Sequence, residues 1–188
     1  MIHRLALVEA IVGRGTHVWP WAHICAGAVV GSNCNICERV FIEKGVTIGD
    51  RVTVKCGVSL WKGLTVKDDV FIGPGAVFTN DSRPRSRIWI EPEPTTLSRG
   101  CSIGANATIL AGLTIGKWSL VGAGAVVTRS LLPYSLVVGN PAKMVGHVCV
   151  CSKTLNLNHR NITGSASCSC GREYEKKLGL VREVTVHV

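Results

Sequence analysis

Apolar residues recur at every sixth position along most of the chain. The first run has twelve successive members, mostly β-branched: Val12, Val18, Ile24, Val30, Ile36, Ile42, Ile48, Val54, Leu60, Val66, Ile72 and Phe78. The residue four places after nearly every one of them is small or apolar, as with Ala22, Val40 and Val58. A period of six matches neither an α-helix nor a simple alternating strand. It predicts a short strand and a corner in each hexad, with one side chain pointing into a shared interior.

The same register returns after an interruption, at Leu97, Ile103, Ile109, Ile115, Val121 and Val127. Eighteen hexads predict six coils if three hexads form one turn, and Ala6 and Ala10 suggest an earlier hexad. The strands of a β-sandwich would show apolar residues with a period of two and would not keep them in register at every sixth position. We therefore predict an all-β protein, a hexapeptide-repeat parallel β-helix whose stacked coils lie about 4.8 Å apart.

Glycines punctuate the hexads at two places. Some, including Gly73 and Gly104, directly follow the inward-facing residue, and others, such as Gly57, lie two residues later. The second position is where a corner can need a positive φ, which glycine adopts at little cost.

The repeat divides the chain into three parts. Residues 1–147 are expected to form the β-helix domain, interrupted at residues 80–96 by a polar, Pro-containing loop excursion. Insertions in repeat proteins lie on the surface and often carry function. Residues 148–188 lack the repeat and are expected to form a small C-terminal β tail, ending in a strand from Val181 to Val188.

The composition of the chain limits the classes of ligand and partner that are expected. Lys and Arg exceed Asp and Glu by 21 to 12, which indicates either simple solubility or an anionic ligand. The basic residues form no clear cluster and no aromatic platform accompanies them, so a phosphorylated small molecule is favoured over nucleic acid. No apolar run is long enough to span a bilayer and no signal-peptide pattern opens the chain, so no membrane partner and a cytoplasmic location are expected.

Several segments together resemble one family of hexapeptide transferases. They are Phe41-Ile42-Glu43, Ile48-Gly49-Asp50-Arg51-Val52, Phe78-Thr79-Asn80-Asp81, Gly104-Ala105-Asn106-Ala107 and Val138-Gly139-Asn140-Pro141-Ala142-Lys143. They are similar to the 3-N-acetyltransferases of nucleotide-linked amino sugars, especially those acting on UDP-2-acetamido-3-amino-2,3-dideoxyglucuronate. The resemblance implies a left-handed helix, a homotrimer, acetyl-CoA as co-substrate and a role in surface polysaccharide biosynthesis, including that of lipopolysaccharide.

The excursion carries the candidate catalytic residues, Asn80 and Asp81. A sugar amine with a pKa of about 8 is partly neutral at physiological pH, so positioning can supply much of the rate without a strong base. We expect Asn80 to orient the amino sugar and Asp81 to accept hydrogen bonds from it. The alternative is an Asx turn that only lets the chain leave the coil.

Further candidates for the substrate are His23, Glu43, Lys55 and Arg85. Glu43 and Lys55 stand where an apolar residue would have been easy, and the alternative for both is solvated charge. His23 lies in a matched motif and either contacts the sugar or caps a corner. Arg85 could bind a phosphate or a sugar carboxylate, or belong to a basic loop.

Acetyl-CoA requires backbone groups for its pantetheine amides and cations for its phosphates. Gly104, Ala105, Gly122 and Ala123 lie at corners that allow close approach. Arg129 and Lys143 are the candidates for the phosphates, and an ordinary solvent face is the alternative for both.

The tail contains two cysteine pairs, Cys149/Cys151 and Cys168/Cys170. Four thiolates could form a tetrahedral structural zinc site of the zinc-ribbon type, although one residue separates each pair where two are usual. Free thiols in a small hairpin are the other interpretation. Cys34 and Cys101 fall at inward positions and are expected to fill the core.

Three other functions compete. A hexapeptide O-acetyltransferase would need a histidine to deprotonate a hydroxyl, and the excursion has none. A γ-class carbonic anhydrase needs three histidines on neighbouring coils, whereas the repeat region offers only His17 and His23, on adjacent faces of one coil. A non-catalytic solenoid scaffold would need neither the excursion nor the Asn80-Asp81 step.

Overall fold

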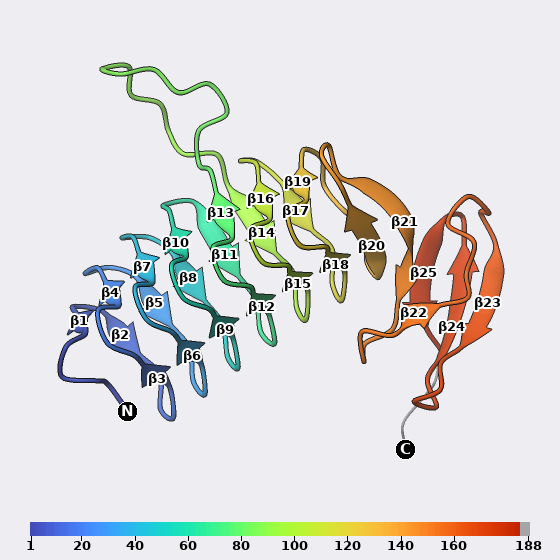
Figure 1. Ribbon diagram of the computed structural model, residues 1–188, viewed down its shortest axis with the longest axis horizontal. Helices are drawn as coiled ribbons and strands as arrows, with labels where there is room; N and C mark the ends of the chain where they lie inside the picture. Colours follow the sequence, from blue (N-terminus) through green and yellow to red (C-terminus); the bar gives the residue numbers. More distant parts are fainter. Residues whose placement is uncertain (185–188) are drawn as a thin grey trace.

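The computed structural model describes residues 1–184, and these form short strands wound into a three-sided column followed by a small sheet (Figure 1). The first face contains β1 (Leu7–Val8), β4 (His23–Ile24), β7 (Phe41–Ile42), β10 (Ser59–Leu60), β13 (Val77–Phe78), β16 (Thr108–Ile109) and β19 (Val126–Val127). The second contains β2 (Ile11–Val12), β5 (Val29–Val30), β8 (Thr47–Ile48), β11 (Leu64–Val66), β14 (Thr95–Leu97) and β17 (Thr114–Ile115). Strands within each face run parallel.

The third face continues beyond the repeat. It contains β3 (His17–Val18), β6 (Asn35–Ile36), β9 (Thr53–Val54), β12 (Phe71–Ile72), β15 (Ser102–Ile103), β18 (Leu120–Val121) and β20 (Ser135–Val138). Two antiparallel strands, β21 (Lys143–Val148) and β22 (Thr154–Leu155), then extend the sheet. The architecture confirms the predicted left-handed parallel β-helix.

Register explains why the sixth positions are apolar. Val54 lies beside Ile72, and Ile72 lies beside Ile103, so each inward side chain stacks on the one a coil away. Val54, Val66 and Ile72 share one buried cluster, which confirms the expected common interior. Burying such a side chain contributes about 1.5–3 kcal/mol, and the stacking repeats this gain along the column.

The two glycine positions have different physical causes. A Cβ on Gly73 would lie 2.7 Å from the backbone nitrogen of Ala105, so this position lets neighbouring coils approach. Gly57 has a φ of 73° and open space around it, so it serves the corner conformation, as predicted.

Two boundaries differ from the prediction. The suggested earlier hexad is real, because Leu7 and Val8 pair with His23 and Ile24, so the column has more than the six expected coils. The excursion ends before Thr95 rather than after residue 96, since β14 begins there. Thr95 is buried, and its hydroxyl accepts a hydrogen bond from the amide of Gly112, which lets a polar residue occupy the core.

A three-stranded antiparallel sheet forms the tail: β23 (Gly164–Ser167), β24 (Glu173–Lys177) and β25 (Leu180–Glu183). The expected final strand from Val181 to Val188 therefore starts one residue earlier and ends at Glu183; residues 185–188 lie outside the described residues. The ring of Tyr174 packs against Tyr134 at the end of the column, with centroids 5.3 Å apart. Over residues 1–184, we find no helix with the length and apolar character needed to cross a membrane.

Candidate active site

The excursion leaves the corner between the first and second faces and projects from the column beside β13 (Figure 1). A cavity of about 250 Å³ lies at its base. Three predicted residues line this cavity: Asn80 and Asp81 from the start of the excursion and Glu43 from the corner after β7. The remaining lining residues are Lys62, Ile88, Trp89, Ile90 and Pro92.

Glu93 fastens the two ends of the excursion together. Its backbone N–H donates to the carbonyl of Asn80 at 3.0 Å, and its carboxylate accepts the N–H of Ser82 at 3.3 Å. These two bonds join the start and the end of the excursion, whereas residues 82–91 are exposed.

Each carboxylate of the cavity has one oxygen engaged by a backbone amide. Asp81 Oδ1 accepts the N–H of Arg83 at 2.7 Å, which is the Asx turn weighed against a catalytic role. Glu43 Oε2 accepts the N–H of Lys62 at 2.7 Å. The turn and a catalytic role are therefore compatible, since the second oxygen of each group makes no hydrogen bond within the described residues.

Three other predicted substrate residues lie outside this cavity. His23 is half-buried, with Nε2 3.3 Å from Glu9 Oε2 and its ring edge-on to Phe41 at 5.4 Å between centroids. Arg85 is exposed near the tip of the excursion, where its guanidinium donates to the carbonyl of Pro84 at 3.4 Å. Lys55 follows β9, so it lies at the opposite corner, between the third and first faces.

Four of the predicted cofactor residues meet at that opposite corner. Gly104 and Ala105 follow β15, and Gly122 and Ala123 follow β18. Gly104, Gly122 and Ala123 line a shallow recess of about 280 Å³ at this corner. Lys55 belongs to the same column of corners, because Val54, Ile72, Ile103 and Val121 are stacked in register.

Arg129 and Lys143 lie elsewhere, so the cofactor set does not form one site in a single chain. Both line a cavity of about 520 Å³ with Leu132 and Pro141, at the C-terminal end of the column. Arg129 follows β19, which places it on the corner that carries the excursion. Their role in binding the coenzyme A phosphates stays a prediction, which a single chain does not bring together with the glycine corner.

Lys62 is a cavity residue that the sequence interpretation missed. Its Nζ pairs with Glu91 Oε1 at 3.1 Å, which links the coil directly below to the returning arm of the excursion. The repeat could have identified it, because Lys62 lies eighteen residues before Asn80 and so directly beneath it at the same corner.

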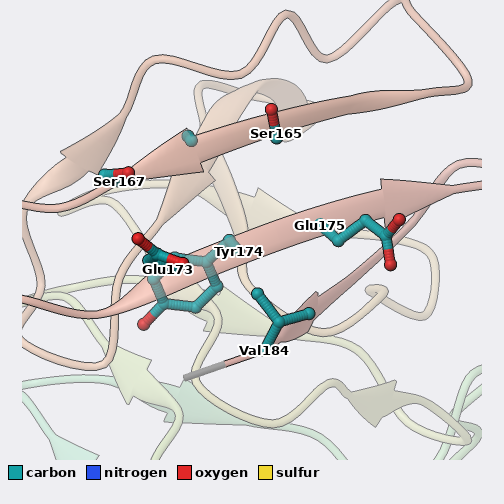
Figure 2. A pocket seen from close by; sticks show the side chains of 7 residues that line it. Ser165, Ser167, Glu173, Tyr174, Glu175 and Val184 are labelled. Atoms are coloured by element: carbon teal, nitrogen blue, oxygen red, sulfur yellow. The ribbon is translucent and has the colours of Figure 1, made fainter.

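The tail contains two further features. The sulfur atoms of Cys149, Cys151, Cys168 and Cys170 all lie within 4.8 Å of one another. A shallow recess of about 450 Å³ lies over β23 and β24, where Figure 2 shows Ser165, Ser167 and Glu175; no predicted site residue lines it. Cys34 and Cys101 are buried in the column as expected, and burial raises the pKa of the Cys101 thiol to about 12.

Comparison with known proteins places the chain in a family. Residues 9–44 and 94–129 match the model described as bacterial transferase hexapeptide (six repeats), and residues 27–62 match that of the hexapeptide repeat of succinyl-transferase. A dTDP-3-amino-3,6-dideoxy-alpha-D-galactopyranose 3-N-acetyltransferase from Aneurinibacillus thermoaerophilus is 47% identical over 98% of this chain and 95% of its own length. The chain belongs to the hexapeptide-repeat nucleotide-sugar 3-N-acetyltransferases. The resemblance drawn from the sequence is confirmed.

Solved structures agree with this family. A hexapeptide-repeat acetyltransferase from Vibrio cholerae, complexed with acetyl coenzyme A, superposes with a TM-score of 0.55 at 26% identity, covering 75% of this chain and 72% of that one. A UDP-N-acetylglucosamine acyltransferase from Bacteroides fragilis shares the fold, with a TM-score of 0.66 at 17% identity over 78% of this chain and 60% of that one. Together with the 47% identical 3-N-acetyltransferase, the acetyl coenzyme A complex confirms the expected enzyme class, an acetyl-CoA-dependent N-acetyltransferase.

The two histidines of the repeat region lie outside the cavity at the base of the excursion. His17 lies on β3 in the third face and His23 on β4 in the first, so the two imidazoles belong to adjacent faces, as predicted. The cavity below the excursion is lined by no histidine. Family membership likewise favours an enzyme over a scaffold.

Proposed function

We propose that the protein transfers the acetyl group of acetyl-CoA to the 3-amino group of a dTDP-linked amino sugar, in the cytoplasm, for surface polysaccharide synthesis. The observation that carries this proposal is the cavity lined by Glu43, Asn80 and Asp81 in a chain 47% identical to a dTDP-amino-sugar 3-N-acetyltransferase. That relative favours dTDP over the UDP sugar that the sequence resemblance suggested first.

The proposed chemistry needs little acid–base catalysis. The neutral amine attacks the thioester carbonyl, its nitrogen gains positive charge, and the carbon–sulfur bond then breaks. Asp81 accepts a hydrogen bond from the amine and so stabilises the developing charge, while Asn80 orients the sugar. The proton released from nitrogen finally goes to the departing thiolate of coenzyme A.

Placement of the donor favours a homotrimer. The glycine corner at Gly104 and the excursion corner at Leu110 bound the same face, and the six residue steps from one to the other span at most about 20 Å. One chain can join its two corners only if the donor lies across the whole face. A threefold arrangement instead allows the glycine corner of one protomer to adjoin the excursion of the next.

A matched pair of substrates tests the reaction. Release of the coenzyme A thiol is measured with dTDP-3-amino-3,6-dideoxygalactose and with the same sugar nucleotide carrying a hydroxyl at C3. We expect turnover of the amine only, and UDP-linked 3-amino sugars should react more slowly. Turnover of the hydroxyl sugar would instead establish the O-acetyltransferase alternative.

Variants of the excursion then test the site. Replacing Asn80 by Ala should lower kcat/KM at least tenfold without changing the sedimentation of the oligomer. Ser82→Ala is the control, because the bond from Ser82 to Glu93 uses only the backbone N–H. Equal activity of both variants would place the site elsewhere.

A further inference from the structure

Four cysteine sulfurs converge between the end of the column and the tail sheet. Cys149 and Cys151 follow β21, and Cys168 and Cys170 follow β23, so two segments far apart in the sequence supply one pair each. The closest pairs are Cys149–Cys170 at 3.4 Å and Cys151–Cys168 at 3.6 Å between sulfurs, and no pair exceeds 4.8 Å.

These separations match a tetrahedral metal site better than disulfides. Zinc–sulfur bonds of about 2.3 Å in a tetrahedron put neighbouring sulfurs about 3.8 Å apart. A disulfide would bring two sulfurs to about 2.05 Å, well inside the observed distances. The pairs that approach most closely also join different segments, so all four sulfurs surround a common centre.

The two segments have the same backbone conformation. In the first, the N–H of Cys149 donates to the carbonyl of Lys153 at 2.9 Å, and the N–H of Ser152 donates to the carbonyl of Cys149 at 2.9 Å. In the second, Cys168 donates to Arg172 at 2.8 Å and Gly171 donates to Cys168 at 2.9 Å.

The fourth residue of each turn, Ser152 or Gly171, has a positive φ, of 68° and 89° respectively. Equivalent turns thus present both cysteine pairs in the same way. Only one residue separates the two cysteines of each pair, where two residues are usual in zinc ribbons. The turn that closes directly after each pair makes this shorter spacing sufficient.

Donors surround the sulfurs. The hydroxyl of Tyr174 donates to Cys149 Sγ at 3.1 Å, and Arg172 Nη1 donates to Cys170 Sγ at 3.5 Å. Four thiolates around a divalent cation leave an excess of negative charge, which such donors stabilise. Lys153 Nζ also joins the two turns through Ser169 Oγ at 2.7 Å and adds a positive charge.

The tail also has too small a core to be stable alone. Its buried cluster consists of Tyr134, Cys149, Leu155, Leu157, Cys168, Tyr174 and Val181, and two of these seven are the cysteines themselves. Segments of this size generally need a metal or disulfides to fold. Tyr174 connects the cluster to the column, because its ring contacts Tyr134 and its hydroxyl contacts Cys149.

We propose that Cys149, Cys151, Cys168 and Cys170 bind one structural zinc ion that holds the C-terminal tail against the end of the β-helix. Four protein ligands leave no open position, so the ion takes no part in acetyl transfer. The proposal stands or falls independently of the amino-sugar substrate.

Metal analysis of the tag-free, full-length protein tests the proposal directly. We expect one zinc per chain by mass spectrometry of the metal content, and release of that zinc as a mercurial reagent titrates four thiols. Cobalt substitution should give the visible bands of a tetrahedral tetrathiolate site. Protein purified without zinc, with iron in its place, or with four hydrogens missing from its intact mass because of two disulfides would overturn the proposal.

Variants add a control within the chain. Cys151→Ser should lose most of the zinc, whereas Cys56→Ser, which changes an exposed cysteine of the β-helix outside the cluster, should retain it. If Cys151→Ser does not fold, hydrogen exchange on chelator-treated wild-type protein replaces it. Protection should then vanish in β23–β25 and persist in the coils, whereas unchanged protection in the tail would contradict the proposed role.

Discussion

Asp81 offers the sharpest test of the active site because one oxygen already has a structural role. Its Oδ1 accepts the N–H of Arg83, and an Asn side chain can accept the same bond. Asp81→Asn therefore preserves the turn and removes only the charge, whereas Asp81→Ala removes both. The turn predicts damage from Ala alone, and catalysis predicts damage from both variants.

The size of the effect follows from hydrogen-bond energetics. A hydrogen bond to a charged acceptor contributes about 1.5–3 kcal/mol and one between neutral groups about 0.5–1.5 kcal/mol. The difference of about 1–1.5 kcal/mol corresponds to roughly a tenfold loss of kcat/KM for Asp81→Asn. Because this interaction strengthens as the nitrogen gains charge, the loss should fall on kcat more than on KM.

The assay is initial-rate thiol release over a range of sugar and acetyl-CoA concentrations, with thermal unfolding measured on the same samples. Ser82→Ala is again the control in the loop. Wild-type kcat/KM for Asp81→Asn, combined with a loss for Asp81→Ala, would reduce Asp81 to a turn residue and refute the reasoning.

Two further predictions concern stability. Gly73→Ala should destabilise the column by about 2–3 kcal/mol, because its Cβ would meet the backbone of the next coil at 2.7 Å. Gly57→Ala adds only the strain of a positive φ, about 1 kcal/mol. Chemical denaturation measures both losses, and a larger loss of stability for Gly57→Ala than for Gly73→Ala would contradict these roles of the glycines. Hydrogen bonds from Arg51 and Arg99 lower the pKa of Asp69, so its contribution is present above about pH 4 and is lost as the pH falls through the folded-state pKa. Asp69→Asn should therefore lower the melting temperature slightly at pH 7, by less than about 1 kcal/mol in free energy, and the difference from wild type should vanish in acid.

The fold was predictable because each coil repeats the same physical requirement. A side chain at every sixth place must fit a closed interior, and this requirement alone identified Val54, Val66 and Ile72 as neighbours. The end of the excursion was misplaced because Thr95 is polar, and only its hydrogen bond to Gly112 shows how the core accommodates it. The tail had no period to use, so only its cysteine pairs were informative.

The active site was predictable in part. Asn80, Asp81 and Glu43 were chosen separately and meet in one cavity, whereas Lys55 and Arg129 lie outside that cavity. The position of a residue in this fold is given by its coil and its corner. Motif matching identifies the type of residue that a site needs but does not show at which coil and corner that residue lies.

The coil and corner of each residue also constrain how acetyl-CoA and the amino sugar can meet. Lys62 lies beneath Asn80 at one corner, and Lys55 lies beneath Gly73 and Gly104 at the other. A cationic position therefore occurs at both edges of the first face, and the close-approach glycines occur at the second of them. Because a rigid column cannot fold these edges together, a donor that touches both must either cross the face or bridge two protomers. Sedimentation equilibrium decides between these arrangements: a stable trimer with one acetyl-CoA bound per protomer fits the bridging arrangement, while an active monomer would require the donor to cross the face.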